Sequence, residues 1–215
     1  MSAENEQARS SGKKGLRFLS EDKEILKRNG YRIYLLHGRN LADLEQEGLR
    51  FTIADDLKEE LLKQRPQNRS HQGEVAFMPE RTILPDSNCL TLEFQDGIAK
   101  YYGERERGRL GLRGVRGGIA RFADYGEIIS NYLQETGVKL LGRSSTPYPS
   151  ARTRTRVFPE MVGPQNFVVD TGPYDSDGLN VRINSRDETD GDIGAWPLLY
   201  PTAKPKALRR LSVKP

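Results

Sequence analysis

The sequence predicts an α+β fold in which short helices lie on one side of a mostly antiparallel sheet. Three observations lead to this prediction. Short runs rich in aromatic and β-branched residues alternate with short amphipathic segments, as the strands and helices of a small domain do. Asn and Gly stand where the amphipathic segments would begin and end. Asp96-Gly97 separates two apolar runs, which is the signature of a two-residue hairpin turn.

These signals set the order of the predicted elements. A helix over 21–28 ends at Asn29-Gly30, and a strand over 31–36 follows it. Asn40 caps a helix over 41–47, which Gly48 ends. The remaining predicted helices cover residues 57–64 and 125–136, and the remaining predicted strands cover 49–53, 74–78, 89–95, 98–102, 138–141 and 179–183.

Changes in composition predict the organisation of the chain. We expect a disordered leader over 1–15, the α+β domain over 16–142, a Ser/Thr/Pro/Arg linker over 143–156, and an extended, turn-rich C-terminal region over 157–215. The prolines near the C-terminus favour an extended or polyproline-like end. We expect the C-terminal region to wrap the domain or a partner.

The net charge of +4 conceals a strong segregation of charge. Residues 101–122 have six arginines against two glutamates, whereas residues 170–192 have seven acids against two arginines. Basic patches of this kind favour a polyanionic partner, RNA or DNA first. The alternative is that the patches are solvated surface or pair with the acidic segment.

The segment GERERGRLGLRGVRGGIARF, residues 103–122, has glycine at every third position from 108 to 117. This spacing matches neither the dinucleotide fingerprint nor the Walker loop. Glycines let a phosphate chain approach the backbone, and guanidiniums bind phosphate and stack on bases. We therefore predict an arginine-bearing loop that contacts nucleic acid, with an ordinary loop or protein contact as the alternative. Its candidate residues are Arg105, Arg107, Arg109, Arg113, Arg116 and Arg121.

A second basic segment, ARTRTR, alternates arginine with threonine. If the segment is extended, Arg152, Arg154 and Arg156 point to one side, about 6–7 Å apart per step. That separation is close to the phosphate spacing of a stretched single strand, about twice the 3.4 Å rise per strand of a duplex. The three arginines are therefore further candidates for nucleic-acid contact, with a solvated linker as the alternative.

Cysteine and histidine are scarce, and this limits the chemistry that the sequence predicts. Cys89 lies in a strand-like context and is expected to be a small buried hydrophobe in a reducing compartment. We expect no metal and no cofactor. The N-terminus has no apolar segment typical of a secretory signal, and no apolar run is long enough to cross a membrane. These features predict a soluble intracellular protein, cytoplasmic or nuclear.

The run RIYLLHGRNLADLEQEGLRF has a strand, His37-Gly38, a helix and a second strand. It is loosely similar, over about twenty residues, to the opening of ADP-ribosyltransferase-like enzymes and RNA 2′-phosphotransferases. Arg39 stands where that family has a hydroxyl residue. The resemblance implies that His37 and Gly38 contact a nicotinamide dinucleotide.

The function that the sequence favours is a non-enzymatic binding or assembly protein. Its arginine-rich segments would contact RNA, DNA or an acidic protein surface. One alternative is an ADP-ribosyltransferase-like enzyme with a dinucleotide at His37-Gly38. The other is a protein–protein scaffold with no nucleic-acid role, in which the acidic segment 170–192 pairs with a basic segment of a neighbouring copy in a homo-oligomer or larger assembly.

Overall fold

The computed structural model describes residues 15–63, 66–141, 150–157 and 167–203. It confirms the α+β class with mostly antiparallel strands, but the strands form two sheets, and helices cover both faces of the four-stranded sheet and not one side as predicted. Within the described residues the α-helices are α1 (Ser20–Arg28), α2 (Leu41–Gln46), α3 (Asp55–Leu62), α4 (Leu92–Leu110) and α5 (Phe122–Thr136). The strands in the same residues are β1 (Arg32–His37), β2 (Phe51–Thr52), β3 (Gln72–Phe77), β4 (Val115–Ile119), β5 (Ser150–Val157), β6 (Phe167–Tyr174), β7 (Leu179–Ser185), β8 (Ile193–Gly194) and β9 (Pro197–Pro201).

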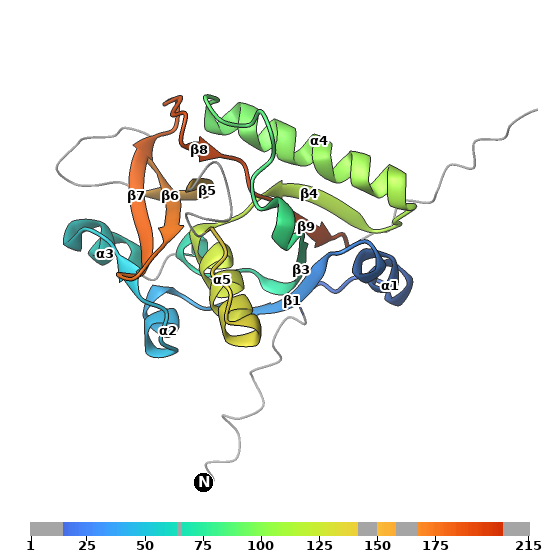
Figure 1. Ribbon diagram of the computed structural model, residues 1–215, viewed down its shortest axis with the longest axis horizontal. Coiled ribbons are helices and arrows are strands. Elements are labelled where there is room, and N and C mark those ends of the chain that lie inside the picture. The colour runs from blue at the N-terminus through green and yellow to red at the C-terminus, as the bar shows by residue number, and fades with distance from the viewer. Residues whose placement is uncertain (1–14, 64–65, 142–149, 158–166, 204–215) are drawn as a thin grey trace, which may run out of the picture.

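The two sheets lie side by side, and each uses strands from distant parts of the chain (Figure 1). The four-stranded sheet has the order β1-β3-β9-β4 and is antiparallel throughout. The five-stranded sheet has the order β2-β7-β6-β5-β8, with parallel pairs at both edges. The strand nearest the C-terminus, β9, thus lies between β3 and β4.

Alternation along β9 places the four-stranded sheet between two helical layers. Leu198 and Tyr200 join the larger core with Ile128 of α5, whereas Leu199 joins a smaller core with Leu26 of α1 and Tyr102 of α4. Helix α4 lies along β4 and β9 on that second side (Figure 1). The pairing of β9 therefore builds both cores.

Tyr125 and Trp196 form the centre of the larger core. Their rings stack at 4.6 Å with an angle of 3° between the ring planes, and both residues are fully buried. The Tyr125 hydroxyl also accepts a hydrogen bond from the backbone N–H of Ala120 at 3.1 Å. This contact fixes the chain between β4 and α5, where the candidate site described below is formed.

The first half of the domain follows the sequence prediction closely. The side chain of Asn40 accepts a hydrogen bond from the backbone N–H of Asp43 at 2.9 Å, which confirms the predicted cap of α2. Gly48 ends that segment with a φ of 96°. Strands β1, β3 and β7 and helix α5 lie within a few residues of their predicted positions.

The predicted hairpin at Asp96-Gly97 is wrong, because both residues lie inside α4. The buried residues Gln95, Ala99, Tyr102 and Glu106 are spaced three or four apart, which is the period of a helix. Two of these four are polar, so the sequence does not show a clean apolar stripe. The strands predicted over 89–95 and 98–102 are replaced by this one helix and the turn before it.

The predicted arginine-bearing loop over 103–122 is also wrong. The segment forms the last half of α4, a left-handed turn at Gly111 with a φ of 67°, and β4. Close packing explains two of its glycines. A Cβ atom added to Gly103 would lie 2.1 Å from the backbone nitrogen of Gly117, so α4 and β4 touch backbone to backbone.

The predicted division after residue 142 needs correction where the chain is described. Residues 150–156, predicted as part of a linker, belong to the largely buried strand β5. The predicted polyproline-like end includes Pro197 and Pro201, which begin and end β9. Cys89 is exposed, with a φ of 55°, and is not a buried hydrophobe. The predicted leader, except for Gly15, lies outside the described residues.

Candidate functional site

A basic pocket of about 280 Å³ lies where α4, β4, β5 and β9 meet. Its cationic side chains are those of Lys100, Arg116, Arg121 and Arg154. His71 and Tyr200 also line it, and their rings meet edge to face at 5.7 Å between ring centroids. We call these six residues the basic pocket. Its lining residues range from His71 to Tyr200 in the sequence, so only the folded chain forms it.

The pocket lies at an edge of the four-stranded sheet, because β4 pairs with β9 on one side only. Every second residue of an edge strand turns its backbone N–H away from the sheet. Strand β5 passes this edge, and Arg154 donates a backbone hydrogen bond to the Ala120 carbonyl at 2.8 Å. Gly118 lines the pocket and has no side chain to fill it. A Cβ atom added there would lie 3.5 Å from Nη2 of Arg154.

The cations of the pocket share few acidic partners. Lys100 and Arg154 both pair with Asp96, at 2.7 Å from the Lys100 Nζ. Burial alone would raise the pKa of Asp96, but hydrogen bonds from Arg154 and Lys100 lower it below its usual value. The guanidinium of Arg116 lies 5.7 Å from the ring centroid of Tyr200, a cation–π distance.

Arg121 and Asp124 form the wall nearest α5. The Arg121 guanidinium donates to the carbonyl oxygens of Pro66, at 3.1 Å, and Arg69, at 3.2 Å. Asp124 is 2% exposed and accepts hydrogen bonds from the backbone N–H groups of His71 and Arg121. Burial raises the pKa of Asp124 to about 6, so its carboxylate is mainly ionised at pH 7.

The remaining titratable side chains of the pocket are neutral at pH 7. Burial lowers the pKa of His71, and the nearby charges of Arg121 and Arg116 lower it further. Burial raises the pKa of Tyr200 well above its usual value. Four cations against the carboxylates of Asp96 and Asp124 leave the pocket with two net positive charges.

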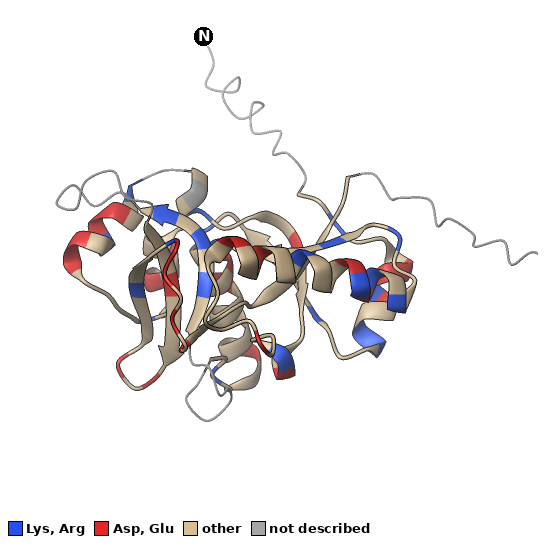
Figure 2. Cartoon of the chain, turned by 90° about the horizontal axis from the view of Figure 1, so that it is seen from above, with Lys and Arg blue, Asp and Glu red and all other residues tan. Residues whose placement is uncertain are grey.

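A second hollow of about 240 Å³ adjoins the basic pocket across Arg154. Arg154, Arg156 and Arg186 line it, and we call these three residues the basic strip. Arg186 pairs with Glu93, whereas Arg156 is exposed and has no ion-pair partner among the residues that the structure describes. Bands of Lys and Arg cross β5 beside the start of α4, while α3 at the far left is largely acidic (Figure 2).

The predicted arginines separate into three groups. Arg116, Arg121, Arg154 and Arg156 lie at the basic pocket and strip. Arg105, Arg107, Arg109 and Arg113 lie toward the other end of α4, beside the acids Glu21, Glu104 and Glu106. Hydrogen bonds from Arg109 and Tyr31 lower the pKa of Glu106, although burial alone would raise it. Arg152 stands alone as the third group.

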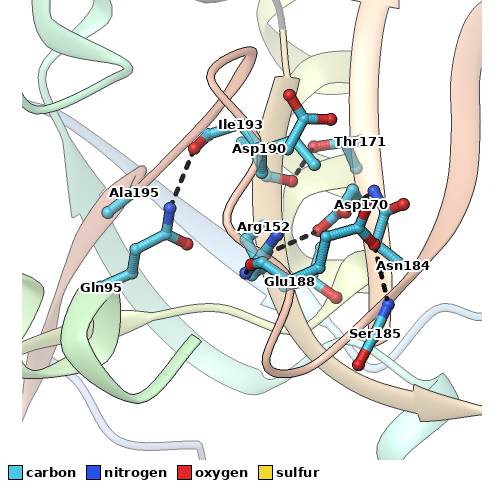
Figure 3. A network of polar contacts seen from close by, with 12 residues as sticks. Gln95, Arg152, Asp170, Thr171, Asn184, Ser185, Glu188, Asp190, Ile193 and Ala195 are labelled. Carbon is cyan, nitrogen blue, oxygen red and sulfur yellow. Dashed lines mark hydrogen bonds and ion pairs between the residues drawn. The ribbon is translucent and has the colours of Figure 1, made fainter. Parts of the chain in front are cut away.

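Arg152 is fully buried, so its prediction as a nucleic-acid contact is wrong. Its Nε lies 3.5 Å from Oδ1 of Asp170, and its Nη1 donates to the carbonyl oxygens of Glu188, at 2.8 Å, and Leu90, at 3.3 Å. Figure 3 shows Arg152 and Asp170 pointing toward each other between strands. Asn184 donates to Asp170 at 2.6 Å, and burial raises the pKa of Asp170 to about 7.

The sequence interpretation missed Lys100, Arg186, His71 and Tyr200 as site residues. The sequence pattern predicts a strand at Lys100 and an extended tail at Tyr200. Lys100 lies in α4 and Tyr200 lies in β9, two elements that the sequence pattern does not predict.

The backbone of His37-Gly38 is already engaged at the end of β1. The His37 N–H donates to Oε1 of Glu127 at 2.9 Å, and the Gly38 carbonyl accepts from Arg69 at 3.2 Å. A hollow of about 450 Å³ lies beside His37, lined also by Arg17 and Gln72. The structure thus places these two residues at a strand end, as the resemblance implies, but with internal hydrogen-bond partners.

Comparisons of the chain with protein-family models, with curated proteins and with solved structures found no match. Among the described residues, no helix has the length and apolar character needed to cross a membrane.

Proposed function

We propose that the protein binds single-stranded nucleic acid, with RNA as the first ligand to test, and that it does so without catalysis. The observation that supports this proposal is the gathering of cations from α4, β4 and β5 on one surface. The basic pocket keeps two net positive charges, and the basic strip continues it past Arg154. Guanidiniums of this kind bind phosphate oxygens in pairs of hydrogen bonds.

The spacing along β5 suits a stretched strand. Arg154 and Arg156 are both exposed and stand two residues apart on β5, a step that is about 6–7 Å in a regular extended strand. This step is close to the distance between phosphates in an extended single strand, about twice the 3.4 Å rise per strand of a duplex. Two successive phosphates can therefore meet two successive guanidiniums.

The test is the salt dependence of binding of a fluorescent single-stranded RNA. We expect affinity to fall as salt rises, with a logarithmic slope of about −0.7 per phosphate contact. The double variant Arg154→Ala/Arg156→Ala should reduce that slope by about 1.4, because two contacts are lost. The matched control is Arg105→Ala/Arg109→Ala, which removes the same charge from the far end of α4 and should leave the slope unchanged.

Three outcomes would count against the proposal. One is RNA affinity that is absent or does not change with salt. Another is an equal loss of affinity in the control variant, since that would show a response to net charge alone. The third is binding of an acidic peptide in place of RNA, which would favour an acidic protein surface as the partner.

A further inference from the structure

We infer that the basic pocket binds a phosphomonoester, and that its source is the terminal phosphate of a nucleic-acid strand whose body lies along the basic strip. The second half of this inference rests on the proposed function. The first half rests on the pocket alone. The inference as a whole predicts that the protein prefers one end of a nucleic-acid strand, beyond a general affinity for its phosphates.

The net charge of the pocket distinguishes a terminal phosphate from an internal one. At pH 7 the pocket keeps two positive charges, from four cations against the carboxylates of Asp96 and Asp124. A phosphomonoester has a charge of about −1.5 to −2 at this pH, whereas an internal phosphodiester has one negative charge. The monoester is thus the ligand that neutralises the pocket.

The cations of the pocket are held in place before any ligand arrives. Arg116 lies over the Tyr200 ring, and Arg121 is fixed by two backbone carbonyls. Arg154 is held by Asp96. Side chains held in this way lose little freedom when a ligand binds, which favours tight binding by a small anion.

The size of the pocket fits the same ligand. Its volume of about 280 Å³ is slightly below the range of about 300–1,000 Å³ typical of drug-sized ligands. That space suits a phosphate and the sugar attached to it. The adjoining hollow of about 240 Å³, lined by the basic strip, gives the rest of the strand a place to lie.

Gly118 gives the inference a direct steric test. Its φ is not in the left-handed region, and a Cβ atom there would meet Arg154 at an ordinary contact distance of 3.5 Å. A larger side chain at this position would therefore occupy the pocket without backbone strain. Arg116→Met is the companion variant, because Arg116 is exposed, lies over the Tyr200 ring and has no ion-pair partner among the described residues.

The experiment compares three RNAs of one sequence, with a 5′-phosphate, a 3′-phosphate or hydroxyls at both ends. We expect one phosphorylated form to bind at least about tenfold tighter than the hydroxyl form, as an added charge-assisted hydrogen-bonding group does. Inorganic phosphate should abolish that advantage. Arg116→Met and Gly118→Val should abolish it too, while the charge-matched control Arg113→Met should retain it. Circular dichroism and the thermal midpoint establish that each variant is folded.

The outcomes separate the inference from the proposed function. Equal, salt-dependent affinity for all three RNAs would overturn the inference and leave the proposed function standing. Inorganic phosphate that binds wild type but not Arg116→Met, with no affinity for any RNA, would overturn the proposed function and the strand end as the source, and would support the pocket as a phosphate site. A tenfold advantage that survives both pocket variants would place the terminal phosphate elsewhere and overturn the inference.

Discussion

Arg152 and Arg154 stand two residues apart on β5 and lie in opposite environments. Arg152 is fully buried beside Asp170 in the interior of the five-stranded sheet, whereas the side chain of Arg154 is 41% exposed at the basic pocket. The pairing of β5 with β6 shifts its register between Arg152 and Arg156, so the simple alternation of an extended strand is broken. Arginines of one alternating segment therefore lie in an internal ion pair at one end and on the exposed basic surface at the other.

The largest effect that we expect from the contrast between Arg152 and Arg154 is on the free energy of unfolding. Arg152→Met would leave the carboxylate of Asp170 buried without its cationic partner and would remove the hydrogen bond to the carbonyl oxygen of Glu188. We expect the free energy of unfolding to fall by about 3–5 kcal/mol, the usual effect of breaking a buried pair. Arg154→Met removes an exposed pair instead and should lower it by less than about 1 kcal/mol. Urea denaturation measures both.

A double variant shows whether the loss comes from the pair. Replacing both partners, as Arg152→Met/Asp170→Leu, should restore part of the stability, because no charge is left buried alone. A loss below about 1 kcal/mol for Arg152→Met would mean that Arg152 is not enclosed as described.

The second effect concerns the buried carboxylates of the two regions. Asp170 faces a guanidinium, whereas Asp124 beside the pocket accepts hydrogen bonds from backbone N–H groups. Burial raises the pKa of Asp124 from 3.8 to about 6, so folding favours its protonated form. The stability that this group contributes is fully present below pH 3.8 and is lost as pH rises through about 6.

We expect this loss to be roughly 2 kcal/mol between pH 4 and pH 7. Asp96 and Glu106 act in the opposite direction, because their pKa values are lowered. The measurement is therefore the difference in unfolding free energy between wild type and Asp124→Asn, followed by urea denaturation across this pH range. A difference that does not change with pH would show that Asp124 is solvated.

The elements that follow local rules could be predicted from the sequence, and those that depend on distant contacts could not. Asn40 and Gly48 mark the two ends of α2, and short apolar runs indicate β1 and β3, so these elements could be placed from the local sequence. Helix α4 was missed because Asp96-Gly97 is a strong turn signal and because Gln95 and Glu106 occupy buried positions. The amide nitrogen of Gln95 donates to the carbonyl oxygens of Ser87 and Ile193, and such partners are not visible in the sequence.

The same reasoning applies to the candidate site. Arg116, Arg121, Arg154 and Arg156 were predicted from composition, and they do gather on one surface. Arg105 and Arg109 have the same composition around them, yet they lie at the other end of α4, and Arg109 is paired with Glu106. A sequence shows which arginines are present. It does not show which ones the tertiary fold brings together.

The smallest effect tests the backbone contact that forms the pocket wall. A Cβ atom at Gly103 would lie 2.1 Å from the backbone nitrogen of Gly117, whereas one at Gly108 would meet nothing within 4 Å. Gly103→Ala should therefore destabilise the protein by about 1–3 kcal/mol, as overpacking does. Gly108→Ala, in the same helix, should stabilise it by about 0.5–1 kcal/mol, because alanine loses less backbone freedom on folding.

Thermal unfolding measures the stability of the Gly103→Ala and Gly108→Ala variants. Phosphate binding by the same variants tests whether the basic pocket, which Arg154 lines, depends on the contact between α4 and β4. Lys100 lies on α4 and Arg116 lies on β4, and both line the pocket. If the added methyl group separates α4 from β4, these two cations move apart. Gly103→Ala should therefore weaken phosphate binding in the protein that remains folded, while Gly108→Ala should leave it intact. Equal stability of the two variants would mean that α4 and β4 are further apart than their glycines indicate, and that the pocket wall does not depend on this contact.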